Sequence, residues 1–293
     1  MPNKPPPVVS IAVLGPDQLG EGPVWDDPNG ELVRVDISGR LVHRWNPTTG
    51  EASSAATHGD VGAVVLCEDG GRVLAIECEL WRVDAAGKMT LLADVETKPG
   101  VRFNDCRADP RGRLWAGTLH RDREHGQAAL YRLDPENVMT MVLPERTISN
   151  GIGWSPDGTT MYYIDSTTQQ IVQFAYDLDS AQLGEQQVFA DIDPTDGLPD
   201  GLTVDAEGGV WVCLFGGGRL RRYRPDGLLE EEIVLPLTNP TCPGFGGSDL
   251  RTLYVTTARH RLSDEQLARE PLAGAVLQLI PGVAGLPVNR YAD

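Results

Sequence analysis

A hairpin motif recurs along this chain at similar intervals, and this regularity restricts the possible folds more than any other feature. In each copy an apolar run reaches an acidic or serine-containing turn, and a second strand follows, as in "GLTVDAEGGVWV" at 201–212. The successive turn glycines are 41, 41, 46 and 50 residues apart, and they are Gly30, Gly71, Gly112, Gly158 and Gly208. Intervals of about 40–50 residues are typical of the four-stranded blades of a β-propeller.

A sixth copy, "FGGSDLRTLYVTT" at 245–257, has lost the turn glycine but keeps the hairpin pattern. Further alternating strands lie between the copies, and only "SDEQLARE" at 263–270 favours a short helix or a loop insertion. The sequence therefore predicts an all-β fold, a six-bladed β-propeller that occupies residues 1–293 as one domain. A β-sandwich would not require six copies in phase. Ring closure is expected from pairing of Val8–Val13 with "GAVLQLI" at 274–280 in the last blade.

Composition narrows the classes of function. A formal net charge of −17 disfavours a nucleic-acid or anionic-membrane surface, which would need a basic patch. Five cysteines, without a CxxC pair, are expected to be reduced and buried. The N-terminus has neither a secretory apolar region nor a membrane span. These features predict a cytoplasmic enzyme or binding protein, for which a monomer is plausible.

Four blades carry an acid or amide at one equivalent position. Asn104, Asn150 and Asp200 each lie eight residues before their turn glycine, and Glu21 lies nine before Gly30, where the turn is one residue longer. Equivalent positions in strands point equivalently, so these side chains should converge on the central channel. The alternative is that 150–151 and 200–201 are turn-forming dipeptides. That alternative explains Glu21 poorly.

Two carboxylates and one or two amides at a narrow channel mouth would be costly to bury without a partner. A divalent cation would offset this cost. All-oxygen ligation favours Ca²⁺, Mg²⁺ or Mn²⁺, and Zn²⁺ or Fe²⁺ is possible where water completes the shell. The pattern therefore predicts one divalent metal ion without identifying it.

The chain resembles the family of senescence marker protein (regucalcin), gluconolactonase and related sugar lactonases. The matching segments cover nearly the whole chain in order, and they are "GEGPVWD" at 20–26, "RFNDCRADPRGRLWAGT" at 102–118, "SNGIGWSPD" at 149–157, "PDGLTVDAEGGVWV" at 199–212 and "FGGSDLRTLYVTTA" at 245–258. The resemblance implies a six-bladed propeller with a metal in the axial channel. It implies that Glu21, Asn150 and Asp200 hold the metal, and that Arg102 and Asn104 contact a sugar acid.

The loop after the third copy departs from the family pattern. Some members bind substrate through a Glu just past the GT of this blade, whereas "GTLHRDREHG" at 117–126 offers Asp122 at the closest position and Glu124 nearby. Asp122 is therefore a candidate substrate contact, and the preferred lactone stays open. His120 and His125, in the same loop, are expected to be solvated surface residues.

The resemblance implies hydrolysis of an aldonolactone to the open acid, with the metal as Lewis acid and Asp200 as general base. No Ser-His-Asp constellation or GxSxG motif supports an acyl-enzyme. Two alternatives remain open: a hydrolase of phosphotriesters or phosphofluoridates on the same scaffold, and a calcium-binding regulatory protein without turnover.

Two further sets of residues recur in phase with the repeat. The tryptophans are expected to pack between strands and blades as core, and they are Trp25, Trp115, Trp154 and Trp211. The aspartates are expected to cap the hairpin turns, and they are Asp26, Asp109 and Asp205.

Overall fold

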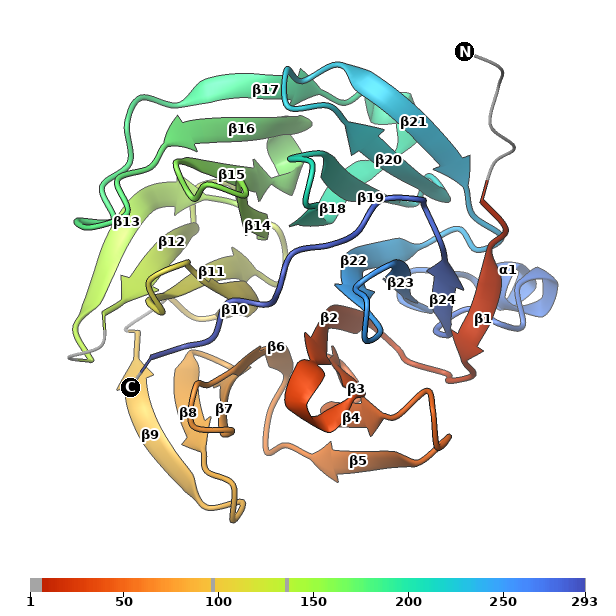
Figure 1. Ribbon diagram of the computed structural model, residues 1–293, viewed down its shortest axis with the longest axis horizontal. Coiled ribbons are helices and arrows are strands. Elements are labelled where there is room, and N and C mark those ends of the chain that lie inside the picture. Colours follow the sequence, from red (N-terminus) through yellow and green to blue (C-terminus); the bar gives the residue numbers. More distant parts are fainter. Residues whose placement is uncertain (1–6, 96–97, 135–136, 293) are drawn as a thin grey trace.

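Six four-stranded antiparallel sheets surround a central axis in the computed structural model, which describes residues 7–95, 98–134 and 137–292. Figure 1 shows the sheets as blades of a ring, with the first strand of each chain repeat nearest the axis. The predicted six-bladed β-propeller is therefore confirmed. The repeat interval was sufficient to predict it because each blade is one supersecondary unit that must bury its faces against its neighbours.

Five blades follow one another in sequence, each built from four consecutive strands in spatial order. The first three are β2 (Gly20–Asp26), β3 (Glu31–Asp36), β4 (Leu41–Trp45) and β5 (Ala52–Ala56); β6 (Val61–Leu66), β7 (Arg72–Ile76), β8 (Glu79–Val83) and β9 (Met89–Asp94); and β10 (Val101–Ala108), β11 (Leu114–His120), β12 (Ala128–Leu133) and β13 (Met139–Arg146). The next two are β14 (Ser149–Trp154), β15 (Thr160–Asp165), β16 (Gln170–Ala175) and β17 (Gln187–Asp191); and β18 (Leu198–Val204), β19 (Val210–Phe215), β20 (Arg219–Tyr223) and β21 (Leu229–Val234). Single 3₁₀ turns interrupt three connections, and they are η1 (Asp27–Asn29), η2 (Ser166–Thr168) and η3 (Pro194–Asp196).

The sixth blade joins the two ends of the chain. Its strands are β22 (Pro240–Gly246), β23 (Thr252–Thr257), β24 (Val276–Leu279) and, outermost, the N-terminal β1 (Ser10–Val13). Ser10 pairs with Gln278 and Ile11 with Leu277 in antiparallel register. The expected closure by an N-terminal strand is thus confirmed, and it leaves the last blade with a full set of four strands.

Every innermost strand contains a register shift at the same place. The shifts fall between Glu21 and Val24 in β2, between Phe103 and Cys106 in β10, and at the corresponding steps of the other four blades. A β-bulge bends the strand and re-aims the side chains beside it. The dipeptides 150–151 and 200–201 lie at these bulges inside β14 and β18. The alternative that they are turn formers is therefore wrong.

The in-phase tryptophans pack in the core as expected. The in-phase aspartates cap their hairpin turns as expected in two blades, but not in the first. The four in-phase tryptophans are all at most 5% exposed. In the third blade Asp109 accepts backbone N–H groups of the turn and the indole N–H of Trp115 at 3.3 Å. Asp205 does the same for Trp211 at 2.9 Å. Asp26 differs: it accepts from side chains instead of capping the turn backbone, because η1 occupies that turn.

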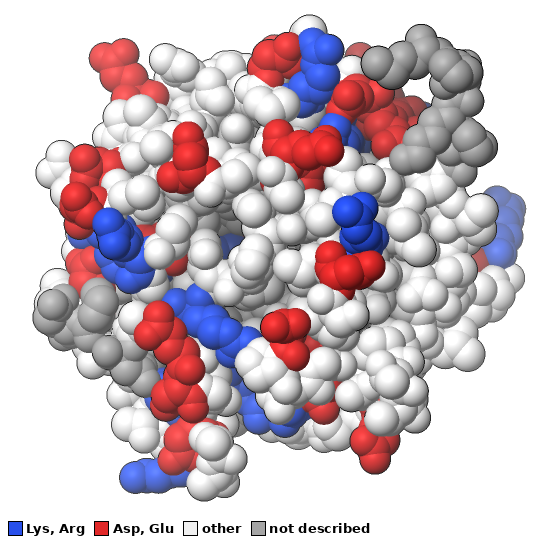
Figure 2. Space-filling view, viewed as in Figure 1, with Lys and Arg blue, Asp and Glu red and all other residues white. Residues whose placement is uncertain are grey.

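The last residues of the chain cross the axis on one face of the ring. Figure 1 shows this segment running in front of the blades toward the third, and Figure 2 shows the same face with a hollow near its middle. The segment 286–289 lines a cavity of about 120 Å³ at this end of the channel. Arg290 pairs with Asp26 at 2.9 Å, and the backbone of Tyr291 bonds with that of Leu66. The crossing segment thereby ties the first three blades together.

Among the described residues, one short α-helix lies beside the sixth blade (Figure 1). The helix α1 (Asp264–Arg269) begins at Ser263, whose side chain and that of Gln266 form a capping box, in agreement with the sequence-based expectation for 263–270. Among the described residues no helix has the length and apolar character needed to cross a membrane.

Replacing Tyr291 by alanine should destabilise the ring. Tyr291 is 1% exposed in the core of the second and third blades, far in sequence from the strands that surround it. We expect Tyr291→Ala to lower the free energy of unfolding by about 3–5 kcal/mol, as for other buried aromatic truncations. Urea unfolding followed by tryptophan fluorescence measures this. Val234→Ala, at a position 75% exposed, is the control and should change the free energy of unfolding by less than about 0.5 kcal/mol. Equal stability of Tyr291→Ala and the parent would contradict a structural role for the crossing segment.

Candidate functional site

A polar cavity of about 270 Å³ opens on the axis at the face opposite the crossing C-terminal segment. Its lining includes all four in-phase polar residues, which are Glu21, Asn104, Asn150 and Asp200. They come from β2, β10, β14 and β18, one from each of four blades. The structure thus brings together the residues that the phase of the repeat predicted to converge. The remaining two blades place Gly62 and Thr241 at their bulges.

Asn150 and Asp200 are in direct contact at the floor of this cavity. The amide nitrogen of Asn150 donates to one carboxylate oxygen of Asp200, and it also donates to the hydroxyl of Ser166 at 3.1 Å. Both are buried, at 5% and 7% exposure. Among the described residues nothing hydrogen-bonds the amide oxygen of Asn150 or the second oxygen of Asp200. Two oxygen atoms of this pair are therefore available to a ligand.

Burial and neighbouring carboxylates raise the pKa of both Glu21 and Asp200. Burial, followed by the negative charges of Asp200 and Asp105, raises the pKa of Glu21 well above its ordinary value. Burial is also the main cause that raises the pKa of Asp200, to about 8, although the hydrogen bond from Asn150 opposes it. Such shifts mark carboxylates that lack a compensating cation. They are typical of functional sites.

A third acid, Asp105, and an arginine, Arg107, lie deeper in the channel than Glu21 and Asp200. Asp105 is 7% exposed, and its Oδ2 is buried without a hydrogen-bond partner. The Arg107 guanidinium lies 3.8 Å from the other oxygen of Asp105 and donates to the Cys242 sulfur at 3.3 Å. Glu21, Asp105 and Asp200 therefore gather at the channel, and Arg107 is the guanidinium beside Asp105. This excess of buried negative charge is the electrostatic reason to expect a bound cation.

The residues present fit a divalent cation. Glu21, Asn150 and Asp200 offer carboxylate and amide oxygens with free valences, and no histidine lies among them, which suits hard, oxygen-preferring ions. The orphaned oxygen of Asp105 adds negative charge below the cluster. The local backbone is compatible too: a Cβ on Gly151 would lie 2.8 Å from the carbonyl oxygen of Asp200, so glycine there lets the two ligand strands approach.

Arg102 and Asn104 form a fixed pair on the wall of the same cavity. The Arg102 guanidinium donates to the carbonyl of Phe103 at 2.7 Å and to Oδ1 of Asn104 at 3.1 Å, and the Asn104 amide donates to the carbonyl of Ser149 at 3.0 Å. Both side chains are 7% exposed. Burial lowers the pKa of Arg102 to about 10, with a further decrease from the charge of Arg121, so the group stays protonated at neutral pH. Its other nitrogens remain available as donors.

In two blades a carboxylate at the end of the second strand bonds the backbone just before the in-phase polar residue. Asp36 accepts from the backbone N–H groups of Gln18 and Leu19, both at 2.9 Å, just before Glu21. Asp165 does the same in the fourth blade for residues 147 and 148, at 2.9 and 3.0 Å, just before Asn150. These bonds fix the backbone from which Glu21 and Asn150 project.

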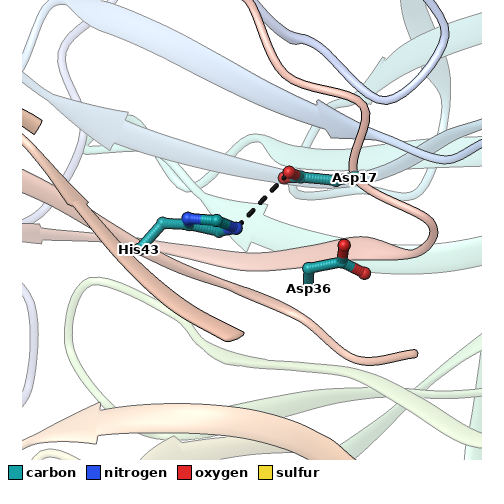
Figure 3. Close-up of side chains that lie close together, drawn as sticks. All are labelled: Asp17, Asp36 and His43. Atoms are coloured by element: carbon teal, nitrogen blue, oxygen red, sulfur yellow. Dashed lines mark ion pairs between the residues drawn. The ribbon is translucent and has the colours of Figure 1, made fainter. Parts of the chain in front are cut away.

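Asp36 also belongs to a second cluster, with Asp17 and His43, which Figure 3 shows beside the β1–β2 connection. Arg34 donates to both oxygens of Asp17, at 3.0 and 3.3 Å, and His43 lies 3.4 Å from the same carboxylate. Asp36 is already bonded to three backbone N–H groups. A cation here would have to displace Arg34. The cluster is therefore structural, and it ties the β1–β2 connection to the first blade.

The loop after β11 differs from the sequence-based expectation. Asp122 is exposed and is absent from the cavity lining, as are Glu124 and His125, so the predicted contact of Asp122 with substrate stays a prediction. His120 was expected to be solvated, and this is wrong: it is 6% exposed, its Nε2 lies 3.1 Å from the carbonyl oxygen of Pro99, and it lines the cavity. Burial follows because His120 is the last residue of β11 and lies under the loop.

Sequence reasoning missed much of the cavity's rim. Arg121, Arg123, His260 and Arg261 all line it, and Ser166 supports Asn150 from below. The loops that carry the rim residues lie outside the repeated hairpin, so no phase relation identifies them. Asp105 had a signal, because it adjoins Asn104 at a bulge that turns successive side chains toward the axis.

Comparison with known proteins agrees with this geometry. Residues 19–259 match the model of the SMP-30/Gluconolactonase/LRE-like region. The chain belongs to this family. It is 36% identical over 288 residues to a regucalcin of Danio rerio, covering 97% of this chain and 98% of that protein. It is 37% identical to a 6-deoxy-6-sulfogluconolactonase of Pseudomonas putida, with 97% and 98% covered. A crystal structure titled as a calcium-binding protein, regucalcin, from Agrobacterium tumefaciens superposes with a TM-score of 0.92 at 32% identity, covering 96% of this chain and 97% of that one.

The raised pKa of Asp200 predicts an unusual pH dependence of stability for metal-free protein. Its folded pKa of about 8 lies above the unfolded value of 3.8, so the folded state binds more protons between these pH values. Stability therefore falls as pH rises through this window. Asp200→Asn removes the titrating group, and should stabilise metal-free protein by several kcal/mol more at pH 8 than at pH 4, because each pH unit between the two pKa values changes stability by about 1.4 kcal/mol. Urea unfolding in excess chelator measures the difference.

The exposed Asp179 on the outer surface offers the matched control, Asp179→Asn. The two Asn variants should differ in their pH profiles but not in fold, which circular dichroism checks. A stability gain for Asp200→Asn that is the same at both pH values would show that Asp200 is not protonated in the folded state.

Proposed function

We propose that this protein is a metal-dependent lactonase that opens aldonolactones to the free sugar acids. The observation that carries the proposal is the meeting of an acid–amide cluster, Glu21, Asn150 and Asp200, with the buried donor pair Arg102–Asn104 in one cavity. The cavity of about 270 Å³ has the size for a single sugar ring. Family membership and the lactonase among its relatives support hydrolysis of a lactone as the reaction class.

Glu21, Asn150 and Asp200 would hold one divalent ion, of which Ca²⁺, Zn²⁺, Mn²⁺, Mg²⁺ and Fe²⁺ are the candidates. When bound, such an ion supplies a Lewis acid that polarises the carbonyl of the ester and stabilises the negative charge that develops on it. The calcium-binding relative in the structural comparison supports a divalent metal. The unpaired negative charge of the cluster supports it independently.

In this proposal Asp200 acts as general base toward the attacking water. One of its oxygens is held by Asn150, which orients the carboxylate, and the other faces the cavity. A positioned base of this kind contributes about 10²–10⁴-fold to the rate. With a cation held beside it, the repulsion from Asp105 would be offset, and Asp200 would stay deprotonated and able to accept a proton at neutral pH.

Arg102 positions the substrate. Phe103 and Asn104 fix its guanidinium, so its remaining N–H groups donate in set directions to sugar hydroxyls, and little freedom is lost on binding. Burial of Arg102 and Asn104 also excludes water from this wall, which strengthens each hydrogen bond formed there.

A chelate-and-restore assay tests the function. Protein stripped with a chelator is assayed on glucono-, xylono-, arabinono- and galactonolactone after addition of each candidate metal, and on a phosphotriester as the alternative substrate class. We expect lactone hydrolysis to be lost on stripping and restored by at least one metal. Turnover of the phosphotriester alone would favour the phosphotriester hydrolase, and metal binding without any turnover would favour a calcium-binding regulatory protein.

Asp200→Asn should abolish turnover of the best lactone. Loss of the general base predicts a fall in kcat of about 10²-fold or more, with the fold intact. Asp179→Asn, the exposed control, should retain the parent kcat. Elemental analysis of Asp200→Asn separates loss of the base from loss of the metal. A variant that is fully active would remove Asp200 from the base role.

Arg102→Ala should act on substrate binding. Removal of the charged donor predicts a rise in KM of about tenfold or more, with metal content close to the parent value. By comparison, Glu21→Gln should lower retained metal in the same elemental analysis. An Arg102→Ala enzyme with unchanged KM on all four lactones would show that the guanidinium does not contact substrate.

A further inference from the structure

The mouth of the cavity carries two arginines that no acid neutralises. Arg123, on the loop after β11, and Arg261, on the loop after β23, both line it. Among the described residues no carboxylate lies within ion-pair distance of either guanidinium. The neighbouring Arg121 shows the contrast, because its guanidinium bonds with Asp60 at 2.8 Å and with Glu77 at 2.7 Å. In a chain of net charge −17, two unpaired arginines at one opening are unexpected.

The two guanidinium groups act on each other and on the floor of the cavity. Burial and then the charge of Arg261 lower the pKa of Arg123, and the carboxylate of Asp200 partly offsets this. The pKa of His260 is lowered by burial and then by Arg261, Arg123 and Arg102 in turn. The arginines are therefore grouped around His260 and within electrostatic reach of Asp200. Like charges held together in this way are stabilised by an anion between them.

The backbone holds both arginines in place. The loop at 259–261 is pinned by hydrogen bonds from His260 N–H to the carbonyl of Gln18 at 2.8 Å and from the Asn239 amide to the carbonyl of His260 at 2.8 Å. Arg123 N–H bonds with the carbonyl of His120 at 2.8 Å. Both arginines have left-handed backbone, with φ of 57° and 66°, which residues with side chains rarely adopt.

We infer that Arg123 and Arg261 form an anion subsite that selects lactones carrying a terminal anionic group, such as a phosphate or sulfonate, at the end of the sugar remote from the ester carbonyl. The inference rests on the proposed lactonase function and defines its substrate class. In this arrangement the ester lies over the acid–amide cluster, Arg102 and Asn104 bind the hydroxyls, and the anionic end reaches the rim. Arg261 and Arg123 approach it from different blades, which suits an oxyanion with several acceptor atoms.

The test compares three substrates that differ only at C6: D-glucono-1,5-lactone, its 6-phosphate, and its 6-deoxy-6-sulfonate. The metal-loaded parent should show a kcat/KM at least about tenfold higher for one or both anionic lactones, because each hydrogen bond to a charged group contributes about tenfold or more. The ratio of phosphate to sulfonate identifies which anion the rim prefers.

Arg123→Gln, Arg261→Gln and the double variant remove the charges. We expect the double variant to lose about 10–100-fold in kcat/KM on the anionic lactones, through KM, and less than about threefold on the neutral one. Arg251→Gln is the control: it removes the same charge from an exposed position of the sixth blade, on the β22–β23 turn, and should preserve the preference. A preference for the neutral lactone, or equal losses on all three substrates, would overturn the inference.

A binding measurement separates this inference from the proposed function. Calorimetric titration with 6-phosphogluconate and gluconate reports on the rim even if no lactone is hydrolysed. Tighter binding of the phosphorylated acid, lost in the double variant, would support the subsite where turnover fails. Equal affinity of the two acids would refute it whatever the activity.

Discussion

Buried negative charge on the axis is the constraint on which the site depends. Glu21, Asp200 and Asp105 face one channel, and burial raises the proton affinity of all three acids. A purely structural core would replace such groups with apolar side chains, since unpaired buried charge is destabilising by several kcal/mol. Their presence therefore indicates that a ligand of positive charge completes the site.

A β-bulge that recurs in every inner strand directs these acids toward the axis. Each inner strand is bulged at the same step, so a residue there points toward the channel whatever its chemistry. Asp36 and Asp165 then fix the amides before two of the ligand positions. Gly62 contributes by being small: a Cβ there would lie 2.5 Å from the carbonyl oxygen of Phe103. The second blade thus has no acid or amide at this position, and its glycine allows the neighbouring strand β10 to pack closely.

The sequence predicts the ring and the floor of the site, but not its rim, and the difference has a physical cause. Repeat spacing determines blade number, and strand register determines which residues converge, so Asn104, Asn150 and Asp200 were identifiable in advance. Glu21 required allowance for one extra turn residue. Loops have no such periodicity. In the 120–123 segment the expected contact was Asp122, yet the cavity is lined by Arg121 and Arg123 on either side of it, with the buried His120 before them.

The floor of the cavity carries negative charge and its rim carries positive charge. This difference affects how a substrate would be oriented. In the proposed function, anionic oxygens at the floor would hold a cation that polarises the carbonyl of an ester, while Arg123 and Arg261 at the mouth would repel cations and attract anions. A sugar acid released at the floor carries a new carboxylate, which Glu21 and Asp200 repel wherever the metal does not neutralise it. The rim would attract that carboxylate outward. The same two arginines can therefore bind the remote end of a substrate on entry and favour departure of its product.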